Sequence, residues 1–171
     1  MEQDHVDRFI ASLPSDLPID PTVEGIVDRI VGLGRRFKRM AEETLAERGL
    51  SHGEYKVLGF LRHATPEPRL SAGTLAKWSE LSSGAMTNRL DRLEEAGLVR
   101  RVPDPHDRRG ILVELTDQGR KSYDDAVGAQ AEGEKLMASA LDQREKEQLN
   151  ALLRRLMLAF EAAEAERKQG P

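Results

Sequence analysis

The chain contains no cysteine, and it has no long apolar run. The absence of cysteine excludes disulfide bonds, thiolate metal sites and thiol-based redox switches. No apolar segment approaches the roughly 20 residues that cross a bilayer. The acidic amino-terminus, Met1-Glu2-Gln3-Asp4-His5, also lacks the basic and apolar stretches of a signal peptide. We therefore expect a soluble, cytoplasmic protein without a membrane partner.

Aromatic residues are also scarce. They make up 4% of the 171 residues, whereas charged residues make up 33%. Such a composition supplies many side chains for solvated helix faces and few large ones for a thick core. A second subunit often completes a small core of this kind, so the composition favours a dimer.

Catalytic and metal-binding motifs are missing as well. The sequence has no glycine-rich phosphate loop and no nucleophile elbow. The four histidines, at positions 5, 52, 63 and 106, do not have the compact spacing of zinc ligands. We therefore expect no enzyme, no metal site and no cofactor.

The net charge of −4 argues at first against a nucleic-acid partner. DNA binding requires only a local basic surface, however, so the positions of the arginines matter more.

The hydrophobic pattern predicts a mainly helical chain. Residues 1–20 contain a short helical segment followed by three prolines, and an amphipathic helix then runs over residues 22–48. Its glycines at 25, 32 and 34 indicate either local weakness or the close approach of another helix. The remaining predicted elements are helices at 51–65, 71–79 and 82–96, strands at 98–102 and 111–115, and helices at 116–140 and 142–160. The charged tail from Glu161 is expected to fray.

The two short helices at 71–79 and 82–96 have helix-turn-helix spacing. Leu75, Leu81, Met86 and Leu90 are expected to form a small core between them. The outer face of the second helix carries small and polar residues suited to phosphates and base edges. The candidates for DNA contacts on this helix are Ser82, Ser83, Gly84, Thr87, Asn88, Arg89 and Arg92. For this helix taken alone, an ordinary solvated face is an equally good interpretation.

The charged loop between the two predicted strands favours the DNA interpretation. It carries Asp107, Arg108 and Arg109 at the tip of a β-hairpin. An extended arginine on such a loop is able to enter a narrow minor groove, where the negative potential is enhanced. Asp107 is expected to pair with one of these arginines and to orient it. The competing interpretation is a surface turn with an incidental ion pair.

Three segments together resemble the MarR family of bacterial regulators. They are residues 82–94, residues 97–99 and the stretch from Asp104-Pro105-His106-Asp107-Arg108-Arg109-Gly110 to Leu115-Thr116-Asp117-Gln118-Gly119. The resemblance covers about residues 22–160. It implies a winged helix-turn-helix core flanked by helices that intertwine into a homodimer. Residues 82–96 would then lie in the major groove, and Arg108 or Arg109 would reach the minor groove with Asp107 bracing it. Two-fold symmetry predicts a palindromic operator with half-sites about 10 bp apart.

The same resemblance divides the chain into three parts. Residues 1–48 form an amino-terminal extension and the first dimerisation helix, residues 49–116 form the winged helix-turn-helix, and residues 117–171 form carboxy-terminal dimerisation helices.

Many relatives bind a small, often anionic aromatic ligand between the dimerisation helices and the DNA-binding core. The residues expected to line such a site are Arg36, Arg39, His52, Tyr55 and His63. The chain also resembles the urate-responsive branch of the family, which has an amino-terminal extension. It departs from that branch in having Phe9 but no tryptophan in the extension, and Lys56 where an acidic residue is expected, so urate itself is not the expected ligand.

The sequence thus predicts a homodimeric transcriptional repressor that a small ligand releases from DNA. Two other functions remain open. The winged helix could bind an acidic protein through the hairpin arginines, or the dimer could bind DNA without any ligand. A preference for one DNA sequence over random DNA separates the first alternative from the predicted function.

Overall fold

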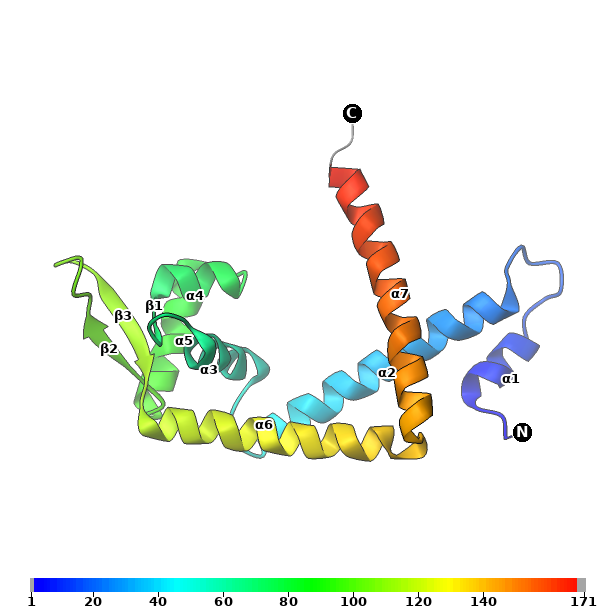
Figure 1. Ribbon diagram of the computed structural model, residues 1–171, viewed down its shortest axis with the longest axis horizontal. Helices are drawn as coiled ribbons and strands as arrows, with labels where there is room; N and C mark the ends of the chain where they lie inside the picture. Colours follow the sequence, from blue (N-terminus) through cyan, green and yellow to red (C-terminus); the bar gives the residue numbers. More distant parts are fainter. Residues whose placement is uncertain (1, 169–171) are drawn as a thin grey trace. The chain divides into compact units, whose positions relative to one another are not determined.

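The computed structural model describes residues 2–168 (Figure 1). It is mainly helical and has one three-stranded antiparallel sheet. The helices are α1 (His5–Ala11), α2 (Pro21–Ala46), α3 (His52–His63), α4 (Ala72–Trp78), α5 (Ser83–Glu95), α6 (Asp117–Met137) and α7 (Gln143–Lys168), with a 3-10 turn at Ala138–Ala140. The strands are β1 (Arg69–Ser71), β2 (Val99–Pro103) and β3 (Ile111–Leu115). This architecture confirms the predicted winged-helix fold class.

The chain forms two compact units, one ending at Gln130 and the other beginning at Ala131. Within residues 2–168, no helix combines the length and the apolar character needed to span a bilayer.

Most helix ends follow local signals in the sequence. Ser51 and Glu54 form a reciprocal capping box at the start of α3, and Asp142 and Glu145 exchange the same two hydrogen bonds before α7. The hydroxyl of Thr116 accepts a hydrogen bond from the backbone N–H of Gly119 at the start of α6 (2.9 Å). Each of these caps confirms the element boundary that the sequence predicts.

Two glycines end helices in the left-handed region, where a side chain would be strained. Gly49 follows α2 with φ +69°, and Gly97 follows α5 with φ +70°. Glu80 adopts φ +55° in the turn between α4 and α5 without being glycine. The tight connection expected there is therefore made at some conformational cost.

The core lies among the inner faces of α3, α4 and α5, the sheet and the first part of α6. Its fully buried side chains include Leu58, Leu75, Met86, Leu90 and Val113. Leu81 packs against the same cluster, which confirms the predicted core of the helix-turn-helix pair.

Two sequence predictions need correction. The predicted two-stranded hairpin has a third strand, β1, which pairs with β3 in the order β1-β3-β2. Three residues are too short for alternation to be recognisable, and their pairing partner lies more than forty residues away. The tail from Glu161 does not fray before Lys168, because α7 continues to that residue.

Candidate nucleic-acid interface

The first two turns of α5 present a face that no other element of the described chain covers. Ser83, Gly84, Thr87 and Asn88 are exposed there, and an added methyl group at Gly84 would meet no atom within 4 Å. Ser82 caps the helix by accepting a hydrogen bond from the backbone N–H of Ala85 (3.3 Å). The remaining free N–H groups at this helix start, together with the helix dipole, favour a phosphate at this position.

The two arginines predicted on the same helix face a different way. The guanidinium of Arg89 lies over Gly53 on α3, and Nη2 of Arg92 is 3.3 Å from Oε1 of Glu54. The structure therefore brings together five of the seven residues predicted on this helix, from Ser82 to Asn88. It directs the other two side chains toward the start of α3.

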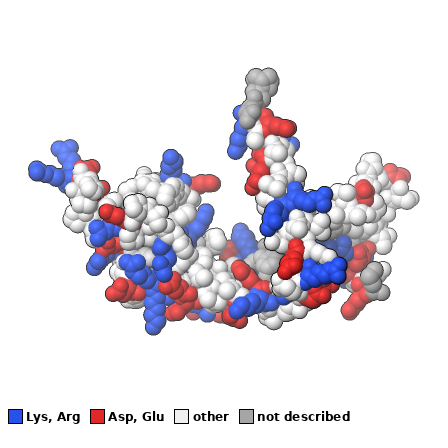
Figure 2. All heavy atoms as spheres, viewed as in Figure 1, with Lys and Arg blue, Asp and Glu red and all other residues white. Residues whose placement is uncertain are grey.

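The wing is a regular antiparallel hairpin with a tight tip. The backbone N–H of Asp104 donates to the carbonyl of Gly110 across the loop (3.0 Å), and that of Gly110 donates to the carbonyl of Asp107 (2.8 Å). Arg108 and Arg109 are exposed at this tip. In Figure 2 basic side chains gather at the far end of the hairpin.

Asp107 does not brace a guanidinium, contrary to the expectation from the sequence. Its carboxylate accepts the backbone N–H of Arg109 at 2.9 Å, and the ion pairs found within residues 2–168 do not include it. Asp107 therefore holds the shape of the loop and leaves both arginine side chains free to extend.

Arg101 joins the wing to α5, a role that the sequence did not reveal. Its Nη2 lies 2.6 Å from Oδ1 of Asp91, and its Nη1 binds Glu94. The hydrogen bonds that Arg101 donates to Asp91 and to Glu94 raise the pKa of its guanidinium. The two carboxylates in the last turns of α5 are thus engaged by β2.

A second arginine pair holds the sheet together. Glu114 on β3 is 5% exposed and accepts from Nε of Arg69 on β1 (2.5 Å) and Nε of Arg100 on β2 (2.6 Å). The three residues are neighbours in the sheet register. Burial raises the pKa of Glu114, but the hydrogen bonds from Arg100 and Arg69 outweigh it, so the pKa lies below the usual 4.5.

An aromatic cavity of about 390 Å³ lies beside α3, bounded by the end of α4 and by α6. It brings together two of the five predicted ligand residues, Tyr55 and His63. Tyr55 stacks on Tyr123 with 5.1 Å between ring centroids, and Nε2 of His63 lies 3.1 Å from the Tyr123 hydroxyl. Lys56 places Nζ 5.9 Å from the ring centroid of Phe60.

Sequence reasoning missed the other seven lining residues, which include Lys56, Phe60, Trp78 and Tyr123. A signal was present, since both tyrosines, the one tryptophan and one of the four phenylalanines meet here. The other predicted ligand residues, Arg36, Arg39 and His52, do not line this cavity. Arg36 hydrogen-bonds the carbonyl of Gly32 on its own helix, and Arg39 lies 3.9 Å from Glu43.

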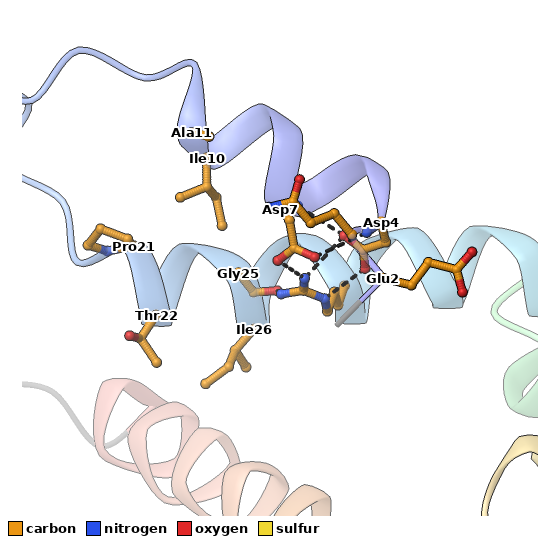
Figure 3. A pocket seen from close by; sticks show the side chains of 11 residues that line it. Glu2, Asp4, Asp7, Ile10, Ala11, Pro21, Thr22, Gly25 and Ile26 are labelled. Atoms are coloured by element: carbon orange, nitrogen blue, oxygen red, sulfur yellow. Dashed lines mark hydrogen bonds and ion pairs between the residues drawn. The ribbon is translucent and has the colours of Figure 1, made fainter.

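The amino-terminal extension forms a separate groove of about 860 Å³ with α2. Figure 3 shows the carboxylates of Asp4 and Asp7 directed at one guanidinium. It belongs to Arg29, whose Nε lies 2.9 Å from Oδ2 of Asp4 and whose Nη2 lies 2.6 Å from Oδ1 of Asp7. The backbone N–H of Asp7 and then the side chain of Arg29 lower the pKa of Asp4 to about 2.

Gly25 lets α1 approach, because a methyl group there would lie 3.2 Å from Cδ1 of Ile10. Of the two interpretations of the α2 glycines, close approach therefore applies to Gly25, while Gly34 faces open space.

Comparison with known proteins identifies the family. The chain is 32% identical to the transcriptional regulator PecS of Dickeya dadantii over 142 residues, which are 82% of this chain and 84% of PecS. The sequence model of the MarR family matches residues 48–110. The chain belongs to the MarR family. That match spans α3 to the wing tip, which is the region that carries the candidate interface.

Solved structures of MarR-like proteins share the fold. YusO of Bacillus subtilis covers 84% of this chain and 99% of its own, with a TM-score of 0.74 at 23% identity. A mutant of MarR from Escherichia coli, solved in complex with operator DNA, covers 75% of this chain and 96% of its own, with a TM-score of 0.56 at 28% identity. With its helix-turn-helix and its wing, this member of the family is a DNA-binding transcriptional regulator.

Proposed function

We propose that this MarR-family protein is a homodimeric transcriptional repressor that binds a palindromic operator and that a small aromatic anion releases. The observation that carries the DNA-binding part is the exposed face of α5 beside a hairpin with two free arginines. This combination suits the two grooves of one DNA half-site. The first turns of α5 would lie in the major groove, and the wing tip would reach the adjacent minor groove.

Seven of the ten DNA-binding candidates have a defined part in this proposal. Ser82, Ser83 and Gly84 would bind a phosphate at the helix start, while Thr87 and Asn88 would face the bases. The hydroxyl of Thr87 donates to the carbonyl of Ser83 at 3.0 Å, which leaves its methyl group for apolar contact with thymine. Arg108 and Arg109 would supply the positive charge in the minor groove, where phosphates concentrate the negative potential.

The homodimer is supported by apolar surface that the single chain leaves uncovered. None of the residues of α7 is buried, yet its exposed apolar side chains recur at helical spacing. These are Leu149, Leu152, Leu153, Leu156 and Phe160, with exposed fractions between 42% and 69%. On α2, Ile26, Ile30, Leu33 and Phe37 are likewise exposed. Faces of this extent favour a partner in water, and two-fold pairing would give the operator a palindromic sequence.

The ligand part of the proposal rests on the aromatic cavity. Tyr55, Phe60, Trp78 and Tyr123 offer ring faces to a planar molecule, and Lys56 offers the positive charge that an anion requires. Trp78 is the last residue of α4, the first helix of the helix-turn-helix pair. A ligand against Trp78 would shift α4 and with it the presentation of α5.

The DNA-binding part is tested by selection from a pool of randomised duplexes with the purified protein. We expect enrichment of a palindrome, with affinity that falls steeply as the salt concentration rises. Arg108→Ala combined with Arg109→Ala should weaken binding to the selected duplex, whereas Arg154→Ala combined with Arg155→Ala on α7 serves as the matched control. Equal binding to selected and random duplexes would favour the protein-interaction alternative.

The ligand part is tested through Trp78, which is the one tryptophan of the chain. Its fluorescence should change when aromatic carboxylates are added, and Lys56→Gln should weaken binding of a carboxylate more than that of the matching neutral amide. A compound that binds by this measurement should also dissociate the protein from the selected duplex. Binding without dissociation would refute the proposed release mechanism, and no response across the panel would favour a regulator without this class of ligand.

A further inference from the structure

The first turn of α3 contacts two arginines of α5. Gly53 is the second residue of α3, and a methyl group added there would lie 2.5 Å from Cζ of Arg89, 2.6 Å from Nη2 and 2.7 Å from Nη1. Three nearly equal distances to the central carbon and two nitrogens mean that the guanidinium lies flat over the Gly53 backbone. Only glycine leaves room for this arrangement.

The next residue of α3 binds the second arginine. Glu54 uses Oε2 to accept from the backbone N–H and the hydroxyl of Ser51, at 2.8 and 2.7 Å, and thereby closes the capping box. Its other oxygen, Oε1, lies 3.3 Å from Nη2 of Arg92. One carboxylate whose side chain is only 13% exposed thus ties the start of α3 to α5.

The conformation of Arg89 does not suit direct reading of bases. Its Nε is buried and lacks a hydrogen-bond partner within residues 2–168, and the residue as a whole is half-buried. An arginine that reads guanine extends into the groove and points its guanidinium at the base edge. Arg89 and Arg92 are three residues apart, so they lie on one side of α5, and both reach toward α3.

We propose that Arg89 and Arg92 are positioning residues, which orient α5 through Gly53 and Glu54 and so determine operator specificity without reading bases themselves. This inference rests on the proposed operator binding and revises the part that the sequence predicted for these two arginines. The face formed by Ser83, Thr87 and Asn88 makes the contacts with DNA. The first turn of α3 controls the angle at which α5 presents that face.

The test is Gly53→Ala, assayed on the duplex that the wild-type protein selects. Alanine has the higher helix propensity, so the melting temperature should stay unchanged or rise. Displacement of the Arg89 guanidinium should nevertheless weaken binding to the selected duplex by roughly three- to tenfold. The slope of log affinity against log salt should not change, because no phosphate contact is removed. Gly128→Ala on α6, where an added methyl group meets open space, is the matched control.

A double-mutant cycle separates positioning from base reading. Arg89→Ala alone should weaken binding to a similar extent, and adding Gly53→Ala to it should have no further effect. Glu54→Gln keeps a side chain that can close the capping box but loses the charge opposite Arg92, so it too should reduce the preference for the selected duplex over random DNA.

The positioning role would be overturned if the Gly53→Ala variant bound the selected duplex as tightly as the wild-type protein or more tightly. Additive effects of Gly53→Ala and Arg89→Ala on this affinity would overturn it as well. A wild-type protein that selects no duplex would instead overturn operator binding itself, and this role with it. The two failures are thus distinguishable, because the first requires a wild-type protein with clear sequence preference.

Discussion

Glu114 is a buried carboxylate, and two arginines from neighbouring strands stabilise its negative charge. Glu114→Gln keeps the shape of the side chain, but its amide NH₂ faces one of two guanidinium groups that are also donors. Removing the charge should therefore lower the free energy of unfolding by roughly 1–3 kcal/mol. Urea denaturation at neutral pH measures the loss. Glu95→Gln on exposed α5 surface is the control, and an equal effect of both substitutions would contradict a special role for Glu114.

The same residue predicts a pH dependence. The pKa of Glu114 is lower in the folded than in the unfolded protein, whose ordinary value is 4.5. Its contribution to stability is therefore fully present above pH 4.5 and decreases as the pH falls through the folded-state pKa. The difference in unfolding free energy between wild type and Glu114→Gln should shrink over this acidic range. A difference that stays constant on acidification would show that the ion pairs do not contribute.

At the scale of elements, Arg101 fixes the wing against α5. Arg101→Gln removes the charge that binds Asp91 and Glu94 and leaves these two carboxylates close together. We expect a loss of roughly 1 kcal/mol in stability, since all three side chains are partly exposed and water screens them. We also expect operator affinity to fall by about tenfold, because the wing tip and α5 would no longer be held in one geometry. Arg35→Gln on exposed α2 surface is the control. Full operator affinity in Arg101→Gln would show that the two elements bind DNA independently.

The docking of α1 on α2 depends on a close approach at Gly25. Gly25→Leu should displace α1, because even its Cβ would lie 3.2 Å from Ile10 and 2.9 Å from Nη1 of Arg29. Hydrogen exchange of the backbone amides in residues 5–11 should become markedly faster. Gly34→Leu on the same helix, at a position that faces open space, is the matched control. Unchanged protection of α1 in Gly25→Leu would mean that another contact holds it.

At the scale of the whole molecule, the proposed homodimer predicts that the apolar face of α7 carries the subunit contact. Leu156→Glu places a charge in the middle of that face and should convert the dimer to monomers, as measured by light scattering after size-exclusion chromatography. Operator affinity should fall with it, since a monomer engages only one half-site. Arg154→Glu lies on the opposite side of the helix and should leave the dimer intact. A dimeric Leu156→Glu variant would place the subunit contact elsewhere.

Interactions between residues close in sequence were readable from spacing alone. The capping boxes at Ser51 and Asp142, the stops at Gly49 and Gly97 and the hairpin with its basic tip each depend on a few neighbouring residues. The helix-turn-helix core also followed from the sequence, because its apolar residues repeat at helical spacing within one short stretch. These features were sufficient to predict the winged helix and the exposed face of α5.

Contacts between distant segments were decided only by the tertiary structure. Arg89 turns toward Gly53, Glu114 lies between arginines from two other strands, and Tyr123 completes a cavity begun by Tyr55. In each case the partner is many residues away, so its position depends on how the elements pack and not on the local pattern. Composition and periodicity therefore determined most of the elements, with β1 as the exception, and which face of α5 is polar. Packing determined which arginines stay exposed and which ones pair with other parts of the protein.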